Sequence, residues 1–269
     1  MSSAAQPRVM VFDGVCLSFG GECVLDNISF EVARGETLVI QGAAASGKTL
    51  ILKLALGLIR PTRGRIFLFG EDVTDYSDAQ WNGVRARIGM LFQEGGLFDS
   101  LTVEENVAYP LLNQLRTPLT EEEVRRRVEE SLEFVELGHT LDKFPSELSG
   151  GMRRRVGIAR AIVTQPELLL YDSPTAGLDP ITATTIMALI VKGRDMSRAT
   201  TVMVTHRHQD GELLDRYRWD PSTGSLAPAE PGSTRTRYMV LREGKIVFLG
   251  TPAEFDACED AYVAKFASR

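Results

Sequence analysis

The stretch ETLVIQGAAASGKTLILKLALGLI, residues 36–59, decides the fold of this chain. A short apolar run leads into Gly42, and GAAASGKT then fits the pattern G-x-x-x-x-G-K-[ST]. The residues that follow have the apolar spacing of a helix. Strand, glycine loop and helix in this order are the context that a phosphate-binding loop requires. The stretch therefore predicts an α/β nucleotide-binding core, and the alternative is a chance glycine turn before a helix.

In such a loop the backbone N–H groups surround the phosphates, and the positive end of the helix dipole favours their charge. Lys48 is expected to neutralise the β- and γ-phosphates, and the Thr49 hydroxyl to bind Mg²⁺. The predicted nucleotide-binding residues are Gly42, Ala43, Ala44, Ala45, Ser46, Gly47, Lys48, Thr49 and Leu50.

The composition limits the classes of function. The chain has 269 residues, 43% of them hydrophobic, and a formal net charge of −6, which disfavours nucleic-acid binding. Three cysteines without metal-ligand spacing indicate a reducing compartment. We find no secretory signal in residues 1–10 and no run long enough to span a membrane. Any role at a membrane would therefore depend on a partner.

Short strands dominate the first part of the chain, and roughly residues 95–160 are predicted to form a helical subdomain. Two helices there have capping-box signals, Thr102 with Glu105 and Thr120 with Glu123. In the second helix Val124, Val128, Leu132 and Val135 should line one face, and Glu121–Arg125 and Glu122–Arg126 are spaced for ion pairs.

Strand patterns resume after the helices, at residues 166–172 and 200–206, and a hairpin over 238–250 turns at Glu243-Gly244. Residues 220–236 are rich in Pro, Gly, Ser and Thr, so we expect an exposed, disordered loop there. The predicted organisation is a nucleotide-binding domain over residues 8–250 and a helical tail over 251–269.

Two further motifs carry chemistry. Asp172 ends the apolar run LLLYD, and a carboxylate at the end of a strand beside a phosphate loop suits Mg²⁺. The motif LSGGM begins at Leu148 and places Ser149, Gly150 and Gly151 at the start of a helix. Taken alone, each motif could be purely structural. Asp172 could simply end a strand, and Ser149 with its two glycines could be an ordinary helix cap.

Together the motifs resemble those of ATP-binding-cassette ATPases. The phosphate loop, LFQ ending at Gln93, LSGGM, LLLYDSPTAGLD and VTH ending at His206 occur in that family's order. The resemblance implies a RecA-like parallel-sheet core with an antiparallel β portion and an inserted helical subdomain. It also implies ATP and Mg²⁺ as ligands, with Thr49, Gln93 and Asp172 at the metal.

The resemblance further implies roles for individual residues. Phe19 is similar to the aromatic residue that stacks on adenine, although it could instead be a core residue. Gln93 and His206 are expected to contact the γ-phosphate. Asp179 is expected at the dimer interface, and Ser149–Gly151 on the ATP of the second subunit. ATP would thus hold two copies of the chain together, and its loss would release them.

A narrower similarity joins residues 89–111 and 148–162 to the ATPases of Mla-type lipid transporters. It implies a homodimer on the cytoplasmic face of the inner membrane, attached peripherally to an integral-membrane permease dimer, with lipid-binding partner proteins. Two other classes remain possible. One is an ATP-binding switch with little turnover, and the other is a family member that acts on nucleic acid or ribosomes.

Ser173 departs from the family pattern, which has a catalytic glutamate at this position. Loss of a positioned general base typically slows a reaction by about 10²–10⁴-fold. The sequence therefore predicts ATP binding and dimer closure with slow hydrolysis. A natural degenerate site, a deliberate substitution that traps ATP, and a compensating carboxylate would each explain the serine. Glu94, beside Gln93, is the carboxylate nearest in sequence for the last explanation.

Overall fold

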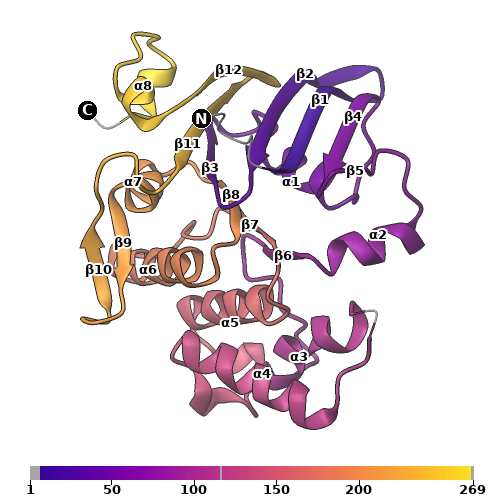
Figure 1. Ribbon diagram of the computed structural model, residues 1–269, viewed down its shortest axis with the longest axis vertical. Coiled ribbons are helices and arrows are strands. Elements are labelled where there is room, and N and C mark those ends of the chain that lie inside the picture. The colour runs from indigo at the N-terminus through magenta and orange to yellow at the C-terminus, as the bar shows by residue number, and fades with distance from the viewer. Residues whose placement is uncertain (1–6, 116, 268–269) are drawn as a thin grey trace, which may run out of the picture.

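The computed structural model describes residues 7–115 and 117–267 of the chain (Figure 1). Three parts of the chain lie outside this range: residues 1–6, which belong to the stretch searched for a secretory signal, residue 116, and residues 268–269 of the expected tail.

A mixed sheet forms the centre of the molecule, with the strand order β12-β11-β3-β8-β7-β6. Its members pair in parallel, except that β12 runs antiparallel to β11 at the edge. The strands are β3 (Thr37–Gly42), β6 (Ile88–Leu91), β7 (Leu168–Asp172), β8 (Thr200–Val204), β11 (Thr236–Arg242) and β12 (Lys245–Gly250). β3, β7 and β8 are buried along their whole length, which explains why they read as continuous apolar runs.

An antiparallel sheet with the order β2-β1-β4-β5 packs beside this core (Figure 1). Its strands are β1 (Arg8–Phe19), β2 (Glu22–Ala33), β4 (Arg63–Leu68) and β5 (Glu71–Asp72). Phe12 and Phe30 stack across β1 and β2 with ring centroids 4.8 Å apart. Helix α1 (Lys48–Ala55) lies under this sheet and buries Ile51, Leu52 and Leu54.

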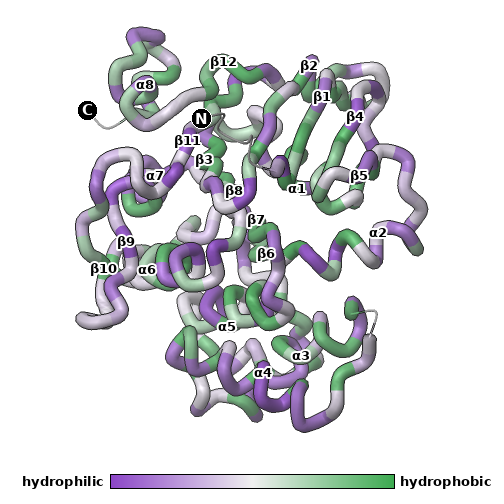
Figure 2. Tube along the Cα trace, viewed as in Figure 1, coloured by the Kyte–Doolittle hydropathy of each residue, from purple (hydrophilic) through white to green (hydrophobic). Residues whose placement is uncertain are grey.

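The helical part lies below the central sheet in Figure 1. It contains α3 (Val103–Asn113), α4 (Glu121–Phe134), α5 (Gly150–Ile162) and the short 3-10 helices Gly138–Thr140 and Pro145–Glu147. On the predicted face of α4, Val128, Leu132 and Val135 are buried, and Val124 is half-buried against the same core. Figure 2 shows hydrophobic residues along β1, β4 and β6, whereas hydrophilic residues dominate α4. Helix α2 (Asp78–Arg85) connects the antiparallel sheet to β6.

Two predicted details of α4 differ in the structure. Arg126 pairs with Glu123 at 3.2 Å and with Glu130 at 2.6 Å, and Arg127 also binds Glu123. The prediction that Glu122 engages Arg126 is therefore wrong. Thr120 caps the helix by accepting from the Glu123 amide, but the Glu123 carboxylate is held by the two arginines. The box formed by Thr102 and Glu105 is complete, as predicted.

The expectation of a disordered loop over residues 220–236 is wrong for much of that segment. After α6 (Pro180–Ser197) and α7 (His208–Arg216), the chain forms an antiparallel hairpin of β9 (Tyr217–Asp220) and β10 (Ser225–Pro228). The hairpin lies beside α6 (Figure 1), where the Trp219 amide donates to Asp195 and the Trp219 ring lies 5.1 Å from the Lys192 ammonium. Composition alone did not indicate these contacts with a distant helix.

The C-terminal segment forms α8 (Pro252–Asp256) and a 3-10 helix over Val263–Lys265, in agreement with the expected short helices. Phe255 is 1% exposed and stacks on Tyr238 of β11 at 4.5 Å. The segment therefore packs on its own chain.

Candidate functional site

The glycine loop between β3 and α1 is fixed by close contacts. Gly42 has φ of 148°, and a Cβ there would lie 2.4 Å from the Leu241 carbonyl oxygen. Gly47 has φ of 100°, and a Cβ there would lie 2.5 Å from Leu25. Both positions therefore require glycine. Lys48 Nζ donates to the carbonyls of Gly42 at 2.9 Å and Ala43 at 2.6 Å, so its ammonium lies in the curve of the loop.

A cavity of about 260 Å³ opens beside this loop, and Thr49, Gln93, Glu94 and Asp172 line it. Asp172 is 6% exposed and ends β7, the neighbour of β6 in the sheet. A hydroxyl, an amide and one carboxylate are the hard oxygen ligands that Mg²⁺ takes together with nucleotide phosphates. Burial lowers the pKa of the Lys48 ammonium, and the nearby Asp172 charge opposes that shift. The residues present thus fit the predicted Mg-nucleotide.

Ser173 follows Asp172 in a left-handed backbone conformation, with φ of 48°. Its Oγ donates to Asp172 Oδ1 at 3.2 Å. The backbone is held from both sides, because its amide donates to the Val204 carbonyl and its carbonyl accepts from Arg154. Arg154 also donates to the Ala176 carbonyl at 2.8 Å. No sequence pattern indicated this role, because an arginine on a helix is usually solvent-exposed.

A buried carboxylate joins the segment after Ser173 to the segment that carries His206. Asp210 is 1% exposed, and its Oδ2 accepts from Thr175 Oγ1 and from Thr205 Oγ1, both at 2.6 Å. His206 itself is exposed two residues beyond the end of β8. Sequence reasoning missed Asp210, since its two partners meet it only in the folded chain.

The residues predicted to face a second copy of the chain lie at the N-termini of α5 and α6. Ser149 caps α5 by accepting from the Met152 amide at 3.2 Å, and Gly150 is exposed. Asp179 caps α6, and hydrogen bonds from Thr182 hold the pKa of its carboxyl below the usual value. Within the described chain, none of these residues lines the cavity beside Thr49. Phe19 is 51% exposed at the end of β1, so it is not a core residue.

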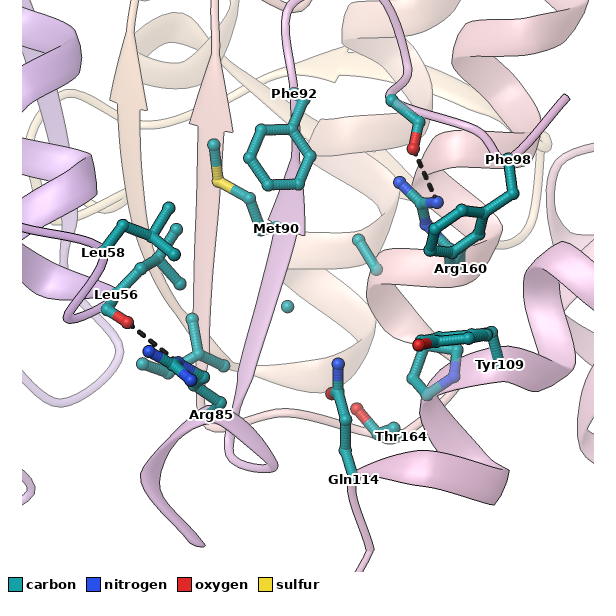
Figure 3. Close-up of a pocket in the computed structure, with 15 residues that line it drawn as sticks. Leu56, Leu58, Arg85, Met90, Phe92, Phe98, Tyr109, Gln114, Arg160 and Thr164 are labelled. Atoms are coloured by element: carbon teal, nitrogen blue, oxygen red, sulfur yellow. Dashed lines mark hydrogen bonds between the residues drawn. The ribbon is translucent and has the colours of Figure 1, made fainter. Parts of the chain in front are cut away.

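An apolar groove of about 230 Å³ lies beside β6 (Figure 3). Phe92, Phe98 and Tyr109 line it, each more than one third exposed, and Arg160 closes one end by donating to the Gly96 carbonyl. The groove and the cavity beside the phosphate loop share Leu56, Leu58, Met90, Phe92 and Gly96.

The fold and the loop define a phosphate-loop nucleotide-binding protein. Comparison with known proteins gives the family: residues 25–176 match the ABC transporter model, and the chain belongs to that family. Members of this family bind ATP with Mg²⁺, as this chain does. No helix within residues 7–115 and 117–267 is long and apolar enough to cross a membrane.

Several relatives are similar over much of the chain. The intermembrane phospholipid transport ATP-binding protein MlaF of Escherichia coli is 41% identical over 94% of this chain and 86% of its own length. Protein TRIGALACTOSYLDIACYLGLYCEROL 3 of Arabidopsis thaliana is 35% identical over 93% of this chain and 71% of its own. The probable ribonucleotide transport ATP-binding protein mkl of Mycobacterium leprae is 39% identical over 72% of this chain, and the match spans 55% of its own length.

Among solved structures, the dimeric bacterial ABC cassette MJ0796 matches with a TM-score of 0.77 and 29% identity, over 90% of this chain and 98% of its own. A dimeric post-hydrolysis state of the same cassette, bound to ADP and Pi, matches with a TM-score of 0.76 and the same identity. The predicted fold class is thereby confirmed.

Proposed function

We propose that this chain is the ATPase subunit of a transporter of phospholipids or other lipids, powered by ATP-driven closure of a homodimer. The observation that best supports closure is the separation of two phosphate-binding elements in one chain. Thr49, at the end of the loop, lines the cavity that includes Asp172, whereas Ser149–Gly151 lies outside it. A second copy would bring its helix start to the open side of the nucleotide, where its amides and dipole favour negative charge.

Surface features near Asp179 suit such a dimer. Ile181, two residues further on, is 82% exposed at the start of α6. Large apolar side chains that are this exposed are typical of contact surfaces when they lie beside polar groups. In the proposed dimer, Asp179 and Ile181 face the other copy, and His206 contacts the γ-phosphate from its own chain.

The groove in Figure 3 is the proposed docking site of the permease. Its exposed aromatic residues would accept a short helix from the membrane partner. Phe92 and Met90 belong to the groove and to the nucleotide cavity at once, and Gln93 follows directly. Movement of Gln93 on nucleotide binding would therefore change the wall of the groove.

The lipid substrate is proposed from the relatives. MlaF is described as a phospholipid transport protein, and the similarity covers 94% of this chain. On this proposal the chain is peripheral on the cytoplasmic face of the membrane, and lipid-binding proteins join the permease. The division into an ATPase domain (8–250), a helical subdomain (95–160) and a tail (251–269) is part of the same proposal.

Ser173 favours a second candidate function, an ATP-binding switch. The Ser173 hydroxyl donates a hydrogen bond to Asp172 and is not basic near neutral pH. This position therefore supplies no general base for the attacking water. The third class, action on nucleic acid, is disfavoured by the net charge of −6.

Purification of the tagged chain from solubilised membranes of its own source tests the proposal. We expect a permease to be retained, together with phospholipid, and the permease to be lost when Phe92 and Phe98 are both changed to Asp. Recovery of the chain without any integral-membrane protein would contradict a transporter role.

A further inference from the structure

We propose that Glu94 is the general base for ATP hydrolysis in this chain and fills the role that Ser173 cannot perform. The inference rests on the proposed function and concerns the same nucleotide cavity. It identifies a catalytic residue at a position where the family pattern does not place one.

The sheet brings Glu94 and Ser173 to the same edge. β6 and β7 are parallel neighbours, and Leu91 pairs with Tyr171 in their register. Ser173 lies two residues beyond Tyr171 and Glu94 three residues beyond Leu91, so each follows the end of one of two neighbouring strands. Neighbouring strands in a sheet are about 5 Å apart. Glu94 lines the same cavity as Thr49 and Asp172. Glu94, after β6, therefore brings a carboxylate to the cavity next to the strand β7, after which Ser173 stands in place of a glutamate.

The backbone at Glu94 is held in place. The Gly95 amide donates to the Phe92 carbonyl at 2.9 Å, which makes Gln93 and Glu94 the central residues of a turn. Arg160, 9% exposed, donates to the carbonyls of Gly95 at 2.9 Å and Gly96 at 2.8 Å. A fixed turn with an exposed carboxylate suits a group that must meet a substrate water.

One arginine, Arg154, links the Glu94 carboxylate to the backbone of Ser173. Glu94 interacts electrostatically with Arg154, whose guanidinium donates to the Ser173 carbonyl at 3.3 Å. Within the described residues, no side-chain hydrogen bond engages the Glu94 carboxylate. It is therefore available to accept a proton, whereas the Ser173 hydroxyl donates its own to Asp172.

The proposed step is balanced. The water oxygen bonds to the γ-phosphorus as the bond from that phosphorus to the β,γ-bridging oxygen breaks, and ADP leaves with the electron pair. The water proton passes to the Glu94 carboxylate and then to the released phosphate or to solvent. Lys48 and the loop amides stabilise the charge that develops on the phosphoryl oxygens.

The test compares Glu94→Gln, Ser173→Glu and the double variant with the unaltered protein, and Glu129→Gln on exposed α4 is the matched control. Binding of Mg-ATP and its hydrolysis are measured on the same samples. We expect Glu94→Gln to lower turnover by about 10²-fold or more with unchanged Mg-ATP affinity. Ser173→Glu should restore turnover in the Glu94→Gln background.

The control should match the unaltered protein in turnover and in melting temperature, as should Glu94→Gln in melting temperature. If Mg-ATP binds but Glu94→Gln leaves turnover unchanged, the assignment of Glu94 is overturned while dimer closure stands. If Mg-ATP does not bind at all, the proposed function itself fails.

Discussion

The hydroxyl of Tyr262 accepts a hydrogen bond from the amide of Ala43 at 3.0 Å. The same hydroxyl donates to the Leu241 carbonyl at 3.0 Å, so the C-terminal segment is tied both to the glycine loop and to β11. The Leu241 carbonyl also borders Gly42, whose position leaves no room for a Cβ. The tail therefore helps to fix the loop that is proposed to hold the phosphates.

Tyr262→Phe should weaken Mg-ATP binding, because the loop loses one of its fixed contacts. The free energy of unfolding should fall by about 1–2 kcal/mol, because both hydrogen bonds of the Tyr262 hydroxyl are lost. Tyr76→Phe is the control, since the Tyr76 hydroxyl binds Glu71 on the surface. Equal ATP affinity in the Tyr262 variant and the control, measured by calorimetry, would refute a role for the tail in shaping the loop.

Asp210→Asn should destabilise the protein and slow hydrolysis. The Oδ2 atom accepts two short hydrogen bonds from Thr175 and Thr205, and a neutral amide oxygen accepts them more weakly than a charged one. The amide NH₂ of Asn would also replace Oδ1, which lies 4.0 Å from the Arg207 guanidinium. We expect the free energy of unfolding to fall by about 2–3 kcal/mol, measured in urea. Thr175→Ser keeps the hydroxyl and should change it little. An Asn variant as stable and as active as the unaltered protein would show that this network is dispensable.

Gly150→Asp separates folding from dimerisation. Gly150 is exposed at the first turn of α5, and a Cβ added there would lie 3.9 Å from the Leu178 side chain, so the position has room for a side chain. A carboxylate there favours the helix by about 0.3–1 kcal/mol, so the monomer should not lose stability. It would repel the γ-phosphate of the other copy, so the ATP-dependent dimer should be lost in size-exclusion chromatography. A variant that still dimerises with ATP would argue against the proposed contact.

Glu167→Gln should reduce stability at neutral pH and have little effect in acid. A hydrogen bond from Arg87 at 2.7 Å lowers the pKa of the Glu167 carboxyl, and Arg34 contributes to the shift. Because the folded pKa lies below the unfolded one, the stabilisation is present above about pH 4.3 and is lost as pH falls through the folded value. The side chain is 35% exposed, so we discount the effect for solvent to about 1 kcal/mol at pH 7. Urea unfolding at pH 7 and pH 3 measures it, and a constant difference between the two would be inconsistent with this ion pair.

The sequence predicted the parts of this fold that depend on local pattern. Residues 36–59 contain a strand, a glycine loop and a helix start in contiguous order, and β7 and β8 read as apolar runs because both of their faces are buried. The hairpin of β9 and β10 was not predicted, because its stability depends on Asp195 and Lys192 of a distant helix.

The same distinction holds for the candidate site. The loop, Asp172 and the start of α5 are recognisable as motifs, whereas Arg154 and Asp210 act through carbonyls and hydroxyls that only the folded chain brings near them. Glu94 is a candidate carboxylate from its position in the sequence alone. Its place beside the Ser173 strand follows from the sheet order, which no local pattern contains.

The central claim is that Gly42–Thr49 of one copy and Ser149–Gly151 of another hold Mg-ATP between them. Titration with Mg-ATP, followed by calorimetry and light scattering, tests it most directly in the unaltered protein and in Lys48→Ala. We predict saturable binding of one ATP per chain accompanied by a doubling of mass, and loss of both in the Lys48 variant. Absence of uptake at saturating Mg-ATP, or equal uptake by Lys48→Ala, would contradict the account.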